Sequence, residues 1–205
     1  MLKTTVKVSH ITNLSDARYC AGMGVEMLGF SIEENSVNYV EIKRFQEIRS
    51  WVAGVQIVAE TDTSEGDDLL EKLQQYQPDA IQVSNAALLP WLKTETDKPL
   101  ILRLEADQDT DTIAQLMESC QSYVSYFLLE SSSDAAFEGD WPHFLGVLAA
   151  RFPILLGFGL NESVVNLITD MLPQVGIALR GSDEIRPGYK EFGELMDLLE
   201  LLEED

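Results

Sequence analysis

The sequence is poor in cysteine and histidine and has no long apolar run. Only Cys20, Cys120, His10 and His143 represent these two residue types, and no pair of them has the spacing of metal ligands. A disulfide scaffold and a zinc centre are therefore disfavoured, and free thiols in a reducing compartment fit better. No run of about 18 apolar residues occurs, which excludes a membrane-spanning helix. The amino-terminal "MLKTTVKVSH" lacks the apolar stretch of a signal peptide, so we expect a cytoplasmic protein.

Basic residues are also scarce. The chain has 14 Lys and Arg residues against 35 Asp and Glu residues, which gives a formal net charge of −21. Such a field repels phosphate backbones and anionic lipid, so we expect neither a nucleic-acid partner nor a membrane partner. A small anionic molecule is still compatible with this charge, because backbone N–H groups can bind it locally.

What the sequence does contain is a regular alternation of two kinds of segment. Short runs rich in Val, Ile and Leu predict eight strands: "TVKVSHI", "MLGFSI", "GVQIVAE", "AIQVS", "LILRLE", "YFLLES", "ILLGFG" and "GIALRG". Segments with helical periodicity lie between them, among them "VEIKRFQEIRSWV", "EGDDLLEKLQQY", "DTIAQLMESCQSY", "PHFLGVLAARF" and "NESVVNLITDML". The pattern is typical of repeated βα units in a parallel sheet.

Eight βα units form either a closed barrel or an open, doubly wound sheet. A dinucleotide-binding open sheet would have G-x-G-x-x-G after its first strand, where this chain has "SHITNLS". We therefore predict an α/β fold, a single (β/α)8 TIM barrel over residues 1–205, with short loops. The fourth helix, around "AALLPWLKTE", is expected to be interrupted by Pro90.

A barrel of this kind places its active site at the carboxyl ends of the strands. That rule selects Ser9, His10, residues 31–34, Glu60, Gln82, Ser84, Arg103, Glu105 and Glu130. Ser9 and His10 are consecutive on a strand, so we expect their side chains to point to opposite faces and reject a serine hydrolase.

The last two strands end in "GFGLNES" and "RGSDE", with glycines and small polar residues before a helix start. The loops after strands 7 and 8 are the usual phosphate site of a barrel. The alternative is that Gly157 and Gly159 only permit tight turns, and that Asn161 caps the following helix.

One further candidate lies in "FEGDWPHF", which places Asp140 on a turn after strand 6 and before a helix. Asp140 is either a catalytic acid or the N-cap of that helix, with Pro142 in its first turn.

The motifs of this chain resemble those of the phosphoribosylanthranilate isomerase family in order from residue 7 to residue 191. "KVSHITNLSDARYCAGMGVEMLGF" resembles that family's K-I-C-G-I-T, D-A and G-A-D-x-L-G-F, and "NSVNYV" resembles S-P-R-x-V. "DAIQVS" is similar to V-Q-L-H-G, "GDW" to F-D-W, "LLGFGLNESVV" to L-A-G-G-L-x-P-x-N-V, and "IALRGSDEIRPGYKE" to D-V-S-S-G-V-E-x-x-P-G-x-K-D.

The resemblance implies an Amadori-type aldose-ketose isomerase acting on N-(5'-phosphoribosyl)anthranilate in tryptophan biosynthesis. It implies that Asp140 is the acid that protonates the ring oxygen. The cysteine base of the family corresponds to Ser9, and a serine hydroxyl hardly ionises near neutral pH. Asn38 stands where the family has the arginine that holds the substrate carboxylate, and Ala178 stands where it has an aspartate.

The phosphate motifs differ as well. Phe158 replaces one glycine of a pair, Arg180-Gly181-Ser182 replaces S-S-G, and "SSSDAAFE" replaces a G-x-G cluster. By resemblance, the expected phosphate contacts come from Gly157, Gly159, Gly181 and Ser182, with substrate contacts from Asn38, Gln82 and Arg103. Arg180 is either an additional phosphate contact or the partner of Asp183 or Glu184.

Two functions remain open from the sequence, namely the isomerase itself and a non-catalytic or repurposed barrel that binds a phosphorylated small molecule or a protein partner. A third is a different reaction with Glu60, Glu105 or Glu130 as the base. We expect a monomer or homodimer without cofactor or metal. A catalytic site would bring Asp140 together with a base, whereas a degenerate one would be filled by Phe158 and His10.

Overall fold

In the computed structural model, which describes residues 1–63, 66–181, 184–186, 189–190 and 193–204, eight parallel strands close into a barrel. The strands are β1 (Val6–Ser9), β2 (Met27–Ser31), β3 (Gln56–Thr61), β4 (Ala80–Val83), β5 (Leu100–Glu105), β6 (Tyr126–Glu130), β7 (Ile154–Leu156) and β8 (Gly176–Arg180). Each strand pairs with its sequence neighbours, and β1 pairs with β8 to close the ring. The prediction of a (β/α)8 barrel is confirmed.

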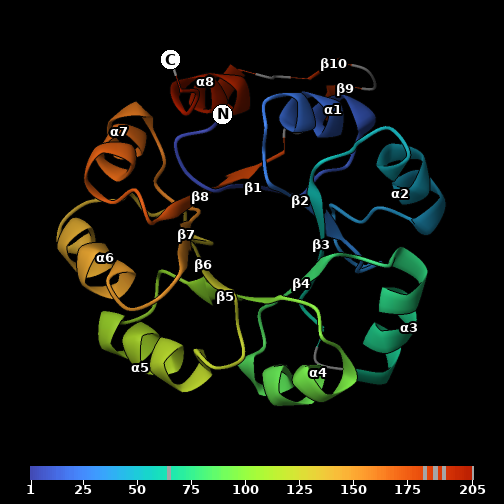
Figure 1. Cartoon of the computed structure of the whole chain (residues 1–205), viewed down its shortest axis with the longest axis horizontal. Coiled ribbons are helices and arrows are strands. Elements are labelled where there is room, and N and C mark those ends of the chain that lie inside the picture. The colour runs from blue at the N-terminus through green and yellow to red at the C-terminus, as the bar shows by residue number, and fades with distance from the viewer. Residues whose placement is uncertain (64–65, 182–183, 187–188, 191–192, 205) are drawn as a thin grey trace.

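Helices surround the barrel on all sides (Figure 1). They are α1 (Leu14–Gly22), α2 (Ile42–Arg49), α3 (Gly66–Tyr76), α4 (Leu89–Glu95), α5 (Thr110–Cys120), α6 (Trp141–Ala149), α7 (Glu162–Met171) and α8 (Gly193–Leu201), with a 3₁₀ turn, η1 (Ala86–Leu88), before α4. Pro90 does not interrupt α4 as expected. It lies in the first turn of that helix, where a missing N–H removes no hydrogen bond.

One element was not predicted. Between β8 and α8 the chain forms a two-stranded antiparallel hairpin of β9 (Glu184–Arg186) and β10 (Tyr189–Lys190), apart from the barrel sheet. None of the described helices is both long and apolar enough to cross a membrane.

The barrel interior changes character along its axis. One layer of inward-facing side chains is apolar in seven of the strands and consists of Met27, Val58, Ala80, Ile101, Leu128, Leu155 and Ala178. Buried Lys7 of β1 is in register with Met27 and Ala178 of this layer. Two residues further along four of these strands, the same alternation turns Glu60, Gln82, Arg103 and Glu130 toward the axis. The barrel interior is therefore polar at the carboxyl ends of the strands, and mostly apolar side chains pack closer to their amino ends.

Candidate functional site

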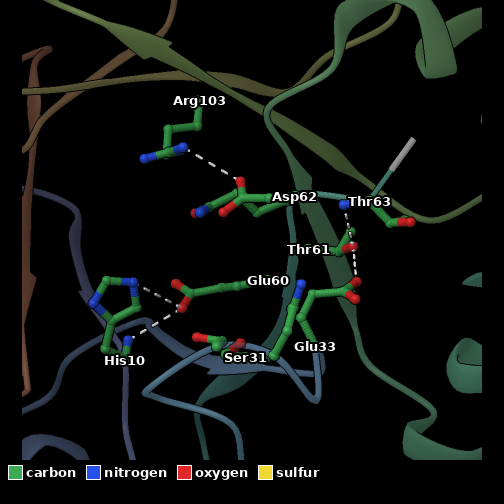
Figure 2. A pocket seen from close by; sticks show the side chains of 11 residues that line it. His10, Ser31, Glu33, Glu60, Thr61, Asp62, Thr63 and Arg103 are labelled. Carbon is green, nitrogen blue, oxygen red and sulfur yellow. Dashed lines mark hydrogen bonds and ion pairs between the residues drawn. The ribbon is translucent and has the colours of Figure 1, made fainter. Parts of the chain in front are cut away.

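A pocket of about 440 Å³ opens at the carboxyl ends of β1 to β5 (Figure 2). It lies where barrels of this type bind their ligands. Its lining consists of His10, Ser31, Glu33, Asn35, Ser36, Glu60, Thr61, Asp62, Thr63, Gln82 and Arg103. The strand-end rule therefore selected much of this lining from the sequence.

A buried ion pair lies beneath the pocket. The Lys7 ammonium donates to a Glu60 carboxylate oxygen and, at 2.5 Å, to the Ser9 hydroxyl. Lys7 is fully buried and Glu60 is 5% exposed. The pair needs a glycine at position 29, because a Cβ there would lie 2.0 Å from Oε1 of Glu60. Gly29 thus clears the space that lets a charged pair lie inside the barrel.

Glu60 is held in its ionised form. Burial by itself would raise the pKa of this carboxyl group, but the Lys7 ammonium, followed by His10, outweighs burial and lowers the pKa below its ordinary value. The charge is further stabilised by the backbone N–H of His10, which donates to Oε2 of Glu60 at 3.1 Å. Glu60 therefore acts here as a fixed anion in the floor of the pocket.

His10 has an unusual backbone. Its φ of 58° lies in the left-handed region, which costs a non-glycine residue energy and is often seen at functional sites. The bend ends β1 and turns the imidazole into the pocket, with Nε2 3.9 Å from Oε2 of Glu60 (Figure 2). The expectation that Ser9 and His10 point to opposite faces was wrong, because the chain leaves strand geometry at His10.

Arg103 is shared among several acids. Its guanidinium lies 3.3 Å from Asp62, 3.3 Å from Glu105 and 3.7 Å from Glu130. Arg180 approaches Glu130 from the other side, at 3.8 Å. Of the two possible partners expected for Arg180, Asp183 lies outside the described residues and the Glu184 side chain is not described. Glu130, which neither alternative named, is its partner here.

Gln82 differs from its charged neighbours. It is 6% exposed and lines the pocket from β4. Its Oε1 is a buried side-chain oxygen with no hydrogen-bond partner among the described residues. Buried polar atoms are nearly always paired in folded proteins, so this acceptor is an exception with a cost.

The opposite side of the barrel mouth is filled with aromatic rings. Phe158, in the loop after β7, is buried and packs edge-on against Trp141 at 4.8 Å and Phe137 at 5.9 Å between centroids. Gly159 has a φ of 61°, and a Cβ there would lie 2.3 Å from the Phe137 backbone nitrogen. The loops after β6 and β7 are therefore in direct contact. Phe158 fills space on this side of the barrel mouth, as we expected of a degenerate site. His10, in contrast, lines an open pocket.

Two of the expected phosphate-binding N–H groups are used within the barrel. The N–H of Gly157 donates to the Leu129 carbonyl at 2.8 Å, and the N–H of Gly181 donates to the Ser9 carbonyl at 2.7 Å. Ser182 lies outside the described residues. A phosphate site in these loops stays a prediction.

Asp140 is exposed and stands at the N-cap position of α6, where its side chain makes no capping hydrogen bond. It does not belong to the pocket lining, and neither does half-buried Asn38. Ala178 lies in the apolar layer inside the barrel. The structure therefore brings together Gln82 and Arg103, with Ser9 beneath the floor, and leaves Asp140 and Asn38 outside the pocket.

The comparison with known proteins gives one sequence relative and many similar structures. A curated N-(5'-phosphoribosyl)anthranilate isomerase of Maridesulfovibrio salexigens is 23% identical over 195 residues, which cover 93% of this chain and 94% of that protein. No protein-family model matches the chain. The crystal structure of phosphoribosyl anthranilate isomerase from Thermus thermophilus superposes with a TM-score of 0.75 at 19% identity, covering 97% of this chain and 98% of that one.

The chain resembles the phosphoribosylanthranilate isomerases in sequence over nearly its whole length, and it shares their fold. A second family structure, from Pyrococcus furiosus, has a TM-score of 0.73 at 15% identity and covers 97% of this chain and 98% of its own. The motif resemblance is thus supported over the whole barrel. At these identities the superposed structures establish the fold only, and the properties of the site follow from this chain's own residues.

Sequence reasoning missed Lys7 and Asp62. A signal for Lys7 was present, since a lysine inside a short apolar strand two residues before Ser9 must share its face. Asp62 follows directly on β3 and faces Arg103 (Figure 2). Its partner on β5 is distant in sequence, so no local pattern indicated the contact.

Proposed function

We propose that the chain is a repurposed member of the phosphoribosylanthranilate isomerase family, which binds a small polar molecule at the carboxyl ends of β1 to β5 and does not use the family's cysteine and aspartate chemistry. The observation that carries this proposal is an open pocket of about 440 Å³ at the ends of these strands, lined by charged, hydroxyl and amide side chains.

The position of Ser9 argues against proton abstraction by this residue. Its hydroxyl is 1% exposed and accepts a hydrogen bond from the Lys7 ammonium, which is itself paired with Glu60. Lys7 in this state has no free lone pair with which to deprotonate the hydroxyl. Asp140, the acid implied by resemblance, is exposed at the N-cap position of α6 and is not part of the pocket lining.

The isomerase reaction is the second candidate. It is favoured by the sequence match to a named N-(5'-phosphoribosyl)anthranilate isomerase over nearly the whole chain and by Asp140, which follows β6 in a motif resembling F-D-W. One solved relative is a complex with reduced 1-(o-carboxyphenylamino)-1-deoxyribulose 5-phosphate, a phosphorylated ligand. Another is described as mutually generated monomers of a dimeric enzyme from Thermotoga maritima, so a monomer or homodimer remains our expectation.

A fluorescence assay with N-(5'-phosphoribosyl)anthranilate separates the two candidates. The native protein, Ser9→Cys and Asp140→Asn are compared at equal concentration. We expect no turnover by the native protein and none by Ser9→Cys, because a thiol at position 9 would remain buried against Lys7. Turnover by the native protein that is lost in Asp140→Asn would instead make the chain a working isomerase with a base other than cysteine.

A further inference from the structure

We propose that His10 is the residue that contacts the ligand of this pocket, and that it does so as an imidazolium facing an anionic oxygen of that ligand. The inference rests on the proposed function, because it names the contact residue of the same pocket. Three observations carry it, namely the backbone conformation of residue 10, the unused nitrogens of its ring, and the pairing of the other charges in the lining.

The backbone conformation of residue 10 suits glycine better than histidine. Its φ of 58° is left-handed, and the motif K-I-C-G-I-T, which "KVSHIT" resembles, has glycine at this place. Contacts with neighbouring strands impose the bend. Oε2 of Glu60 accepts the His10 N–H at 3.1 Å, and the Ile11 N–H donates to the Gly29 carbonyl at 2.9 Å. These contacts use backbone atoms of residues 10 and 11, so the imidazole adds strain without forming the bend.

The imidazole of His10 has hydrogen-bonding capacity that the chain does not use. The side chain lines the pocket and is 33% exposed (Figure 2). Its Nε2 lies 3.9 Å from Oε2 of Glu60, which is too long for a hydrogen bond, and neither ring nitrogen has a hydrogen-bond partner within the described part of the chain. An imidazolium has two N–H donors, so one can face Glu60 while the other donates to a ligand. Ser9 offers no such contact, because its hydroxyl is 1% exposed and already accepts from Lys7.

The acids of the lining already have cationic partners. The pairs are Lys7–Glu60, Lys72–Glu33 and Arg103–Asp62. A protonated His10 therefore adds one positive charge to a lining whose other charges are paired. Such a charge attracts an anion, and the partly buried position of the ring weakens screening by solvent.

The contact should depend on pH. The charged groups that share the pocket with the ring or lie beside it are Glu33 after β2, Glu60 of β3 with Lys7 of β1 beneath it, Asp62 after β3, Arg103 of β5, and Arg180 of β8, which pairs in register with Ser9 (Figure 2). Carboxylates, ammonium and guanidinium groups do not ordinarily titrate between pH 6 and pH 8, whereas histidine does. An anionic ligand should therefore bind more tightly as the pH falls through this range.

A ligand of a solved relative serves as the probe. Reduced 1-(o-carboxyphenylamino)-1-deoxyribulose 5-phosphate has both a carboxylate and a phosphate, which are the two candidate anionic groups. Ribose 5-phosphate and anthranilate each have one of these groups and show which of them His10 contacts. Calorimetry between pH 5.5 and pH 8.5 measures the affinity of the native protein and of His10→Gly for each compound.

The ratio of the two affinities isolates His10, because the titration of the ligand itself is common to both proteins. We expect the native protein to bind the probe about ten times more tightly than His10→Gly at pH 5.5, and about equally at pH 8.5. His10→Asn should behave like His10→Gly, because asparagine tolerates the left-handed backbone and does not titrate. His143→Asn is the matched control and should bind like the native protein, since His143 is the other histidine of the chain and is exposed on α6.

Proton NMR and thermal unfolding separate binding from a structural role. In His143→Asn the remaining imidazole signal is that of His10, and the probe should move the midpoint of its titration to higher pH. Without ligand, His10→Gly should melt no lower than the native protein, because glycine adopts the left-handed backbone without strain.

The outcomes distinguish the contact residue from the proposed function. Equal affinities of the native protein and His10→Gly at every pH overturn the inference and leave a binding pocket. A His10→Gly variant that melts several degrees lower than the native protein shows that the ring is kept for folding, which also overturns the inference. If neither the probe nor its two fragments bind the native protein at any pH, then the proposed binding function fails as well.

Discussion

The two sides of the barrel mouth differ in how they fill the space above the strands. The polar side, at the ends of β1 to β5, keeps an open pocket lined by charged and hydroxyl-bearing residues. The aromatic side, around the ends of β6 and β7, packs Phe137, Trp141, Phe144 and Phe158 into one cluster. Barrels often bind phosphate in the loops after strands 7 and 8. Here the loop after β7 contributes Phe158 to packing, and the open pocket lies on the other side.

The two sides also differ in how their side chains contribute to the stability of the fold. An aromatic cluster stabilises the barrel through burial alone, whereas the polar side contains Lys7 and Glu60, which stabilise each other only as a pair. Folding alone does not require such a pair in the floor of a pocket, beside a Gln82 side chain with an unpaired oxygen. A role in binding would explain why both are kept.

The largest effect is expected from breaking the buried pair. Glu60→Leu leaves the Lys7 ammonium uncompensated inside the barrel and should lower the free energy of unfolding by about 3–5 kcal/mol. The double variant Lys7→Met/Glu60→Leu should recover most of that loss, because it removes both charges. Urea unfolding at neutral pH measures both. A single-variant loss below about 1 kcal/mol would mean that the pair is solvated.

The aromatic side offers the next largest change. Phe158→Ala removes a ring that is 5% exposed and should cost about 3 kcal/mol of unfolding free energy through the lost burial and the cavity left behind. Trp51→Ala is the control, because that ring is 66% exposed and should cost less than about 1 kcal/mol. Equal losses in the two variants would contradict the assignment of Phe158 to the core.

The charge of Glu60 on the polar side should also make the stability of the protein depend on pH in the acid range. The pKa of Glu60 is lowered from its ordinary value of 4.5, so its ionisation stabilises the folded chain fully above about pH 4.5. That contribution is lost as the pH falls further, through the pKa of the folded state. Between pH 5 and pH 3, the unfolding free energy of the native protein should therefore fall more steeply than that of Glu60→Gln, by up to about 1.4 kcal/mol per pH unit. Parallel pH profiles of the two proteins would show that Glu60 is not the group responsible.

The smallest effect distinguishes two helix starts on the aromatic side. Asn161 caps α7 by accepting from the Val164 N–H at 3.1 Å, while Asp140 makes no such bond at the start of α6. Asn161→Ala should cost about 1 kcal/mol and Asp140→Ala less than about 0.5 kcal/mol. Thermal unfolding of the two variants side by side checks the order. A larger loss in Asp140→Ala would restore the capping role that the sequence suggested.

Much of the fold could be predicted because its signals are local. The run "LILRLE" coincides with β5, and "YFLLES" overruns β6 by a single residue. Parallel strands buried on both faces read as continuous apolar runs, and helical periodicity separates them. The hairpin of β9 and β10 was not predicted, because it lies outside the barrel sheet and belongs to no repeating βα unit.

The candidate site could be predicted only in part. The rule of strand ends identified Glu60, Gln82 and Arg103, since position along a strand determines which end a residue occupies. The rule also identified His10, but not that its positive φ turns the side chain into the pocket, and the motif that suggested Asp140 gave no sign that the turn after β6 leaves this residue exposed. Backbone bends of this kind depend on contacts with distant residues, such as the hydrogen bond from His10 to Glu60.

By itself the sequence determined the eight βα units, the strong negative charge and the resemblance to phosphoribosylanthranilate isomerases, with Ser9 where their motif has a cysteine, because composition, periodicity and motif order are properties of the chain. Only the tertiary structure decided that Lys7, Ser9 and Glu60 meet, that Arg103 is shared by three acids, and that Gln82 keeps an unpaired oxygen. The physical reason is that the contacts of Lys7 with Glu60 and of Arg103 with Asp62 join side chains far apart in sequence, and closing the barrel brings them together.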